Sequence, residues 1–218
     1  MRQNETFVLG EGDAWFQRNK VKGANTGQVS RDPVICGASR LFLAPNNILE
    51  IGCANGWRLA ELAQRYGANC TGIDPSQTAI SEALDSNPAH TFHVGTAESL
   101  PLDDSSIDLL IFGFCLYLTD PCDHFRIVYE ADRVLKDGGI LCVYDFAPGR
   151  PYRNAYSHKP GIYSHKMDFA ELFLAHPSYR RLERAYSEHQ KPFSFNQDEA
   201  VAADFLKKNC ADAFPDKP

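Results

Sequence analysis

The feature that most constrains the fold is a short apolar run that breaks into a glycine turn, Asn47-Ile-Leu-Glu-Ile-Gly-Cys-Ala-Asn-Gly-Trp57. Residues 48–51 predict a buried strand, and the apolar spacing over 57–63 predicts a helix that ends near Gly67. Such a turn lets the backbone approach a ligand closely and directs free N–H groups and the positive helix end towards it. By itself the turn is weak evidence for a nucleotide-type cofactor site, because it also serves simply to pack a helix on a sheet.

A second apolar segment strengthens this interpretation. It covers residues 69–73 and ends in Asp74, which stands 24 residues after Glu50. An acidic residue that closes the second strand about 20 residues beyond the turn is placed to accept hydrogen bonds from ribose hydroxyls. The turn and the acid together are more specific than either alone.

Five ordered segments resemble class I S-adenosylmethionine-dependent methyltransferases of the type 11 kind. They are Glu50-Ile-Gly-Cys-Ala-Asn-Gly56, Asp74-Pro-Ser76, Gly95-Thr-Ala-Glu-Ser-Leu-Pro-Leu102, Ile107-Asp-Leu-Leu-Ile111 and Arg133-Val-Leu-Lys-Asp-Gly-Gly139. The usual first motif of that family is acidic-x-Gly-x-Gly-x-Gly, and here Ala54 replaces the middle glycine. The resemblance implies S-adenosylmethionine as the cofactor.

The resemblance also implies where the cofactor binds. Thr96, which stands in place of the more usual aspartate, would lie at the adenine together with Ala97 and Glu98. Trp15 and Arg18, on a helix expected at 13–19 with Asp13 as its cap, would reach the methionine end. An equally weighted alternative is that Trp15 only packs and Arg18 is solvated. The predicted cofactor-binding residues are Trp15, Arg18, Glu50, Gly52, Cys53, Ala54, Gly56, Asp74, Pro75, Thr96, Ala97, Glu98, Phe112 and Gly113.

Composition limits the classes of function. The 218 residues fit one domain, and a net charge of −6 gives no electrostatic footprint for a nucleic acid. The cysteine count of seven is odd, and the absence of a C-x-x-C pair favours reduced thiols over a metal site. The N-terminus has no apolar signal region, and the longest apolar run is too short to span a bilayer. We therefore expect a cytoplasmic protein with a small-molecule substrate, no membrane partner and an oligomeric state left open.

The predicted fold is α/β: a single Rossmann-like, doubly wound sheet, mostly parallel with an antiparallel last strand and helices on both faces. Its expected parts are an N-terminal helical cap at 1–45, a cofactor-binding domain at 46–208 and a tail at 209–218. Residues 200–206 read equally as helix or strand, and the resemblance favours a strand in a hairpin with the segment before it. Further helices are expected from Asp32-Pro33 after a Gly/Asn-rich loop at 22–28, and at 76–84, 123–135 and 168–175; further strands at 91–94, 109–113, 140–144 and 179–186.

The segment 145–168 is too long and turn-rich for a simple connector and predicts a substrate loop. Its stretch 150–166 is basic and aromatic, with Arg150, Arg153, Lys159 and Lys166, which favours a small anionic acceptor. Candidate catalytic residues are His165 and His158 as bases, with solvated loop histidines as the more frequent alternative. Tyr117 and Asp145 are further candidates, because both are expected at the carboxyl edge of the sheet.

The expected activity is methyl transfer to a sugar, a sugar nucleotide or a natural-product intermediate. The stretches 12–19 and 163–169 resemble methyltransferases of pseudaminic acid and other surface-sugar pathways, which agrees with a sugar acceptor. Alternatives are a catalytically silent, cofactor-binding regulatory protein and an NAD-dependent oxidoreductase, whose Gly-x-Gly-x-x-Gly spacing is not matched here. A thiol-dependent metalloid methyltransferase is a more distant alternative.

Overall fold

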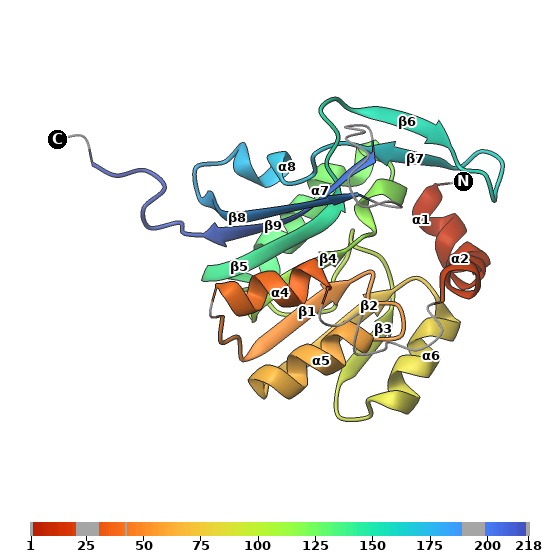
Figure 1. Ribbon diagram of the computed structural model, residues 1–218, viewed down its shortest axis with the longest axis horizontal. Coiled ribbons are helices and arrows are strands. Elements are labelled where there is room, and N and C mark those ends of the chain that lie inside the picture. The colour runs from red at the N-terminus through yellow and green to blue at the C-terminus, as the bar shows by residue number, and fades with distance from the viewer. Residues whose placement is uncertain (1, 21–30, 42, 189–198, 217–218) are drawn as a thin grey trace.

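A seven-stranded sheet forms the centre of the protein (Figure 1). The structure is a computed structural model that describes residues 2–20, 31–41, 43–188 and 199–216. The strand order is β3-β2-β1-β4-β5-β9-β8, in which β1 to β5 are parallel and β9 is antiparallel to both of its neighbours. The bounds are β1 Asn47–Ile51, β2 Asn69–Asp74, β3 Thr91–Val94, β4 Ile107–Gly113, β5 Leu135–Phe146, β8 Tyr179–Glu188 and β9 Ala200–Lys208.

This topology confirms the predicted fold class, and it settles residues 200–206 as a strand. The segment pairs with β8 along its whole length, from Ala200 opposite Glu188 to Lys208 opposite Tyr179. Periodicity could not decide this, because the strand is buried nearly throughout and so has no polar face. The hairpin expected from the resemblance is therefore present.

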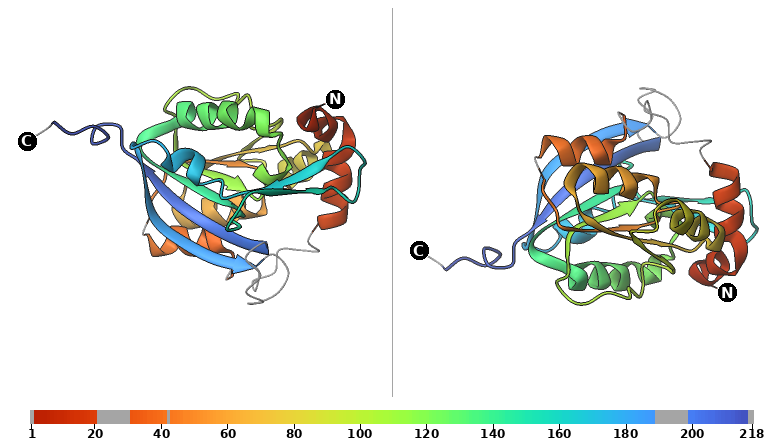
Figure 2. Two further views of the ribbon diagram at one scale, coloured as in Figure 1. Left: turned by 90° about the horizontal axis from the view of Figure 1, so that it is seen from above. Right: turned by 90° about the horizontal axis from the view of Figure 1, so that it is seen from below.

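Helices cover both faces of the sheet (Figure 2). One core packs α4 (Pro33–Arg40), α5 (Trp57–Tyr66) and α6 (Gln77–Ser86) against the sheet, and the other packs α7 (His124–Val134) and α8 (Glu171–Leu174). Side chains alternate across a strand, so Leu109 and Ile111 of β4 enter the first core while Leu110 and Phe112 enter the second. The uninterrupted apolar run of β4 follows from burial on both faces.

The predicted helix starts and stops have identifiable caps. Asp32 accepts hydrogen bonds from the backbone nitrogens of Val34 at 3.1 Å and Ile35 at 2.9 Å, with Pro33 at the first helical position. Ser76 caps α6 through Ala79 N at 3.0 Å. Gly67 ends α5 in the left-handed conformation at φ 66°. Short-range sequence signals were therefore sufficient to predict where these helices begin and end.

Residues 2–20 lie across the carboxyl edge of the sheet as α1 (Gln3–Thr6), the short π-helical segment η1 (Phe7–Glu11) and α2 (Gly12–Asn19). Asp13 does not cap α2 as expected. Its carboxylate instead accepts from Ser76 Oγ at 2.6 Å and Thr78 N at 2.9 Å, so it joins α2 to the start of α6. Gly12 permits this approach, because an added Cβ would lie 3.0 Å from Ser76 N.

The rest of the expected cap lies elsewhere. Helix α4 packs into the core beside α5 and α6, on one face of the sheet. The predicted loop at 22–28 falls outside the described residues. The cap over the carboxyl edge therefore consists of residues 2–20 in the described part of the chain.

Two predicted connections differ in structure. Asp137-Gly-Gly139 was expected to separate α7 from a strand at 140–144, but β5 begins at Leu135, directly after α7. Pairing slips from Ile107–Leu135 to Leu109–Ile140, so the intervening residues form a bulge with Gly138 at φ 78°. The other connection, expected at 145–168 as a loop, contains an antiparallel hairpin of β6 (Tyr152–Ala155) and β7 (Tyr163–Lys166).

In the described residues, no helix is long and apolar enough to cross a bilayer.

Candidate functional site

A cavity opens at the carboxyl ends of β1, β2 and β4 and is closed on one side by α2. We call it the main cavity. Predicted cofactor residues that line it are Trp15, Gly52, Cys53, Ala54, Asp74, Pro75, Thr96, Ala97, Glu98 and Gly113. Lining residues that the sequence reasoning missed include Asn4, Phe7, Phe16, Asn55, Trp57, Arg58, Phe114, Cys115, Leu118 and Thr119. The cavity lies where ligands bind in open α/β sheets.

The glycine turn is held in place by hydrogen bonds from four of its backbone nitrogens. Gly52 N donates to Ile73 O at 2.8 Å and Cys53 N donates to the same oxygen at 3.2 Å. Gly56 N donates to Cys53 O at 2.9 Å, and Ala54 N donates to Asp74 Oδ2 at 2.9 Å. These four N–H groups are therefore not free for a ligand: they fix the shape of the turn before any ligand binds.

Glycine is required at two positions of this turn. Gly52 and Gly56 have φ 76° and 73°, and an added Cβ would lie 2.7 Å from Cys115 Cβ and from Phe92 Cε1, respectively. Ala54 occupies the left-handed region too, at φ 48°. That conformation costs an L-residue roughly 1–2 kcal/mol, which the bond from Ala54 N to Asp74 helps to offset. The alanine at the middle position of the motif is thus accommodated with some strain.

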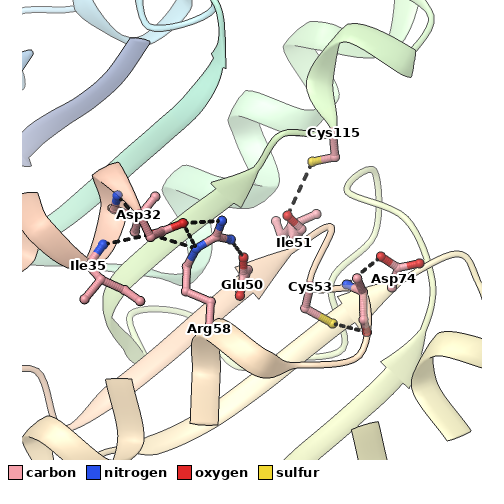
Figure 3. Close-up of polar contacts among 10 residues, drawn as sticks. Asp32, Ile35, Glu50, Ile51, Cys53, Arg58, Asp74 and Cys115 are labelled. Atoms are coloured by element: carbon pink, nitrogen blue, oxygen red, sulfur yellow. Dashed lines mark hydrogen bonds and ion pairs between the residues drawn. The ribbon is translucent and has the colours of Figure 1, made fainter. Parts of the chain in front are cut away.

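Asp74 closes β2 at the wall of the main cavity. One carboxylate oxygen accepts from Ala54 N at 2.9 Å (Figure 3). The other accepts from Ser76 N, also at 2.9 Å. Burial raises its pKa to about 6, although these two bonds oppose the shift. Each carboxylate oxygen has two lone pairs, so both remain able to accept from the hydroxyls of a ribose.

Glu98 supplies a second acceptor in the same cavity. Its side chain is buried, and neither carboxylate oxygen has a hydrogen-bond partner among the described residues. A buried polar group without a partner is costly unless a ligand satisfies it. Glu98 and the neighbouring Thr96 hydroxyl therefore suit the amino group of an adenine, and Asp74 suits its ribose. The residues present fit an adenosine-containing cofactor.

Glu50 lies beneath the turn, in a buried ion cluster (Figure 3). The guanidinium of Arg58 bonds to Glu50 and, at 3.0 Å, to Oδ2 of Asp32. Burial raises the pKa of Glu50 to about 7, in spite of the nearby Arg58 charge. The cluster ties the first turn of α5 to β1 and to the cap of α4. Arg58 itself lines the main cavity. The one sequence signal that could have identified Arg58 as part of the site was a cation in the first turn of a buried helix.

Three other predicted cofactor residues do not line the main cavity. Arg18 pairs with Glu11 at 2.6 Å and donates to the Tyr156 hydroxyl at 2.8 Å, so it joins α2 to the hairpin. Phe112 is fully buried beside Phe173, with ring centroids 6.2 Å apart. Gly56 forms the N-cap of α5. Each contributes to the architecture around the cavity in this structure.

Tyr117 lies between the main cavity and the hairpin. Its hydroxyl accepts from Trp15 Nε1 at 3.3 Å, and its ring packs on Phe114 and Phe146, with centroids 5.3 and 5.2 Å away. Burial raises the pKa of Tyr117 well above its usual value. The phenol therefore stays protonated near neutral pH and can donate a hydrogen bond to a substrate.

Asp145 lies near the end of β5, at the carboxyl edge as expected, but it does not line the main cavity. Its buried carboxylate accepts from Leu116 N and Phe146 N, both at 2.7 Å, and burial raises its pKa to about 7. These bonds hold the turn η2 (Leu116–Leu118) that carries Tyr117. Asp145 thus positions Tyr117 through the backbone of Leu116.

The two candidate histidines differ in setting. His165 Nδ1 is 3.1 Å from Thr119 O, which can only accept, so Nδ1 carries the hydrogen and Nε2 is the free acceptor. Burial lowers the pKa of His165 and favours its neutral form. His158 is exposed near the turn of the hairpin and packs edge-on against Tyr156 at 5.3 Å. Among the described residues, no group of acids, histidines and cysteines could hold a metal ion.

Comparison with known proteins relates this fold and this site to methyltransferases. More particularly, residues 49–143 match the methyltransferase domain family. An uncharacterized methyltransferase of Synechocystis is 34% identical over 106 residues, which cover 48% of this chain and 50% of the relative. The chain thus spans about half the length of the curated relatives it matches.

Solved structures show the same fold over nearly the whole chain. A 1,6-didemethyltoxoflavin-N1-methyltransferase from Burkholderia thailandensis, bound to its substrate and S-adenosylhomocysteine, has a TM-score of 0.72 and 12% identity. The match covers 96% of this chain and 91% of that one. The N-methyltransferase NodS from Bradyrhizobium japonicum, also bound to S-adenosylhomocysteine, has a TM-score of 0.66 at 18% identity and covers 95% and 99%.

Proposed function

We propose that this protein transfers a methyl group from S-adenosylmethionine to a small anionic acceptor. The observation that carries the proposal is the main cavity, which brings together the glycine turn, the ribose acceptor Asp74 and the unpartnered acid Glu98. The cofactor, when bound, supplies a methyl group on a positively charged sulfur. The residues of this chain bind and orient the two reactants.

Orientation accounts for most of the expected rate enhancement, because the sulfonium is already a good leaving group. Holding two reactants in line is worth roughly 7–11 kcal/mol at best. Trp15 and Phe114 line the main cavity beside Tyr117, whose phenol can donate to the acceptor. A base helps if the acceptor is a hydroxyl or an ammonium, and neutral His165, with Nε2 free to accept, stays the predicted base.

The acceptor class rests on the hairpin. Its basic side chains favour a phosphate, a carboxylate or a sugar nucleotide. A relative from Rauvolfia serpentina, 30% identical over 122 residues and covered over 41% of its length, is a norajmaline N-methyltransferase, which agrees with a natural-product intermediate. The stretch 12–19, with its surface-sugar resemblance, also has a packing role through Gly12 and Asp13. The support that the surface-sugar resemblance gives to a sugar acceptor therefore comes mainly from residues 163–169.

Calorimetric titration with S-adenosylhomocysteine, with NAD in parallel, tests the proposal. We expect micromolar binding of S-adenosylhomocysteine and none of NAD. Binding of NAD instead would favour the oxidoreductase. Failure of both to bind folded protein would remove the cofactor assignment. Cofactor binding without methylated product across a set of sugar nucleotides and other small anions would favour the regulatory protein.

A further inference from the structure

A second hollow lies on the other side of Tyr117, between the β6–β7 hairpin and the end of β5. We call it the hairpin hollow. It is lined by Tyr117, Phe146, Asn154, Ser164, Lys166 and Glu199, among others. Figure 1 shows the hairpin lying over this edge of the sheet, close to α1 and α2. None of the described residues of the hairpin lines the main cavity, so the segment expected to bind substrate faces a separate space.

One cation of the hairpin faces this hollow. Side chains alternate across β7, so Ser164 and Lys166 lie on one face while Tyr163 and His165 lie on the other. Residues directly opposite each other in an antiparallel pair share a face, which places Arg153 with His165. The guanidinium of Arg153 rests on the exposed side of the hairpin, 4.6 Å from the Tyr163 ring centroid. Of the four basic residues that predicted an anionic acceptor, Lys166 is the buried one that lines the hollow.

The partner of Lys166 is replaceable. Its Nζ donates to Glu199 Oε1 at 2.8 Å and lies 3.9 Å from the Phe146 ring centroid. Only 7% of the Lys166 side chain is exposed, against 39% for Glu199. A buried ammonium needs a negative partner, whereas a carboxylate with access to water can leave at little cost. Another anion can therefore take the place of Glu199 while Lys166 stays fixed.

Aromatic rings form the wall between the hairpin hollow and the main cavity. Phe114 lines the main cavity and packs on Phe146, with centroids 5.0 Å apart, and on Tyr117. Phe114 has φ 65°, a strained conformation for a bulky residue, and such strain is concentrated at functional sites. A flat or apolar molecular body in the hollow would lie against Phe146 and Tyr117, with one end beside the main cavity.

We propose that the hairpin hollow is the acceptor subsite, in which Lys166 binds a carboxylate or phosphate of the acceptor in place of Glu199, and Phe146 and Tyr117 hold its flat or apolar body. That the bound molecule is a methyl acceptor rests on the proposed function. The binding of an anion at Lys166 can be measured separately.

The test is a ligand-observed NMR titration of the whole chain, with and without saturating S-adenosylhomocysteine, at fixed salt and in a buffer free of phosphate. The probes are benzoate and phenyl phosphate, with benzamide as the neutral analogue. We expect at least one anion to bind, about tenfold or more tightly than benzamide. Binding of benzoate alone or phenyl phosphate alone supports the site and identifies its anion.

Three variants separate this site from a general effect of charge. Lys166→Met should weaken binding of the anion about tenfold or more, while Arg153→Met, which removes an exposed cation from the same hairpin, should leave it unchanged. Glu199→Gln should strengthen binding about two- to fivefold, because a competing carboxylate is lost. A merely structural ion pair would give no such gain.

Several results would overturn the inference. They are equal binding of benzamide, no binding of either anion, Lys166→Met equal to wild type, or Glu199→Gln no tighter than wild type. Titration of each variant with S-adenosylhomocysteine reports folding. Anion binding at Lys166 in a protein that does not bind S-adenosylhomocysteine would refute the methyltransferase proposal and leave the anion site standing.

Discussion

Asp74 should control both the strength and the pH dependence of cofactor binding. Its carboxylate lines the main cavity and already accepts from Ala54 N and Ser76 N, so it is oriented before the ribose arrives. A hydrogen bond to a charged acceptor is worth about 1.5–3 kcal/mol. The loss of two such bonds in Asp74→Ala, at about 1.4 kcal/mol for each tenfold, predicts affinity for S-adenosylhomocysteine weaker by roughly 100-fold or more.

The pH dependence has a defined sign. Burial raises the pKa of Asp74 to about 6, and ribose hydroxyls bind the ionised carboxylate, so a proton competes with the cofactor below that pH. One competing proton predicts affinity about tenfold weaker at pH 5 than at pH 7. The Asp74→Ala variant should lack this dependence.

The assay is calorimetric titration at pH 5, 6 and 7, with circular dichroism to confirm folding. Asp108→Ala is the matched control. Asp108 also accepts from two backbone nitrogens, Asn46 N at 3.1 Å and Asn47 N at 2.8 Å, but at the opposite end of the sheet. It should lose stability without losing affinity. A folded Asp74→Ala protein that binds within threefold of wild type, or wild-type affinity that is flat between pH 5 and 7, would refute the reasoning.

Two further substitutions test the turn and the ion cluster beneath it. Gly52→Ala should abolish cofactor binding, because its Cβ would lie 2.7 Å from Cys115 Cβ, while Gly67→Ala, left-handed with nothing within 4 Å, should lose only about 1–2 kcal/mol of stability; equal affinities in calorimetry would contradict this. Arg58→Met should lower the free energy of unfolding in urea by about 3–5 kcal/mol, because two buried carboxylates lose their counter-ion. Glu50→Gln in the same chain should restore part of that loss, and a loss below about 1 kcal/mol would show that the cluster is not coupled.

The sequence predicted those parts of the site that depend on neighbours along the chain. The strand, the turn and the helix at 47–67 follow from apolar spacing and glycine. Asp74 follows from its distance along one βαβ unit. The cap at Asp32 follows from local side-chain chemistry. Each of these signals spans one or two elements, so it could be interpreted without knowledge of the tertiary structure.

Several assignments could not be made in that way, because they depend on which residues meet across the fold. Trp15 and Tyr117 are separated by 102 residues, and Lys166 and Glu199 by 33. Phe112 and Gly113 are neighbours in sequence, yet one enters the core and the other the main cavity, since side chains alternate across β4.

By itself, then, the sequence determined the fold class, the glycine turn and the place of Asp74 at the end of the second strand. Tertiary structure alone decided that Arg58 joins Asp32 to Glu50, that Asp145 supports Tyr117, and that the basic segment is a hairpin with a single buried ammonium. The physical reason is that hydrogen bonds within a turn are set by adjacent backbone geometry. Burial, ion pairing and raised pKa values instead arise from packing between elements distant in the chain.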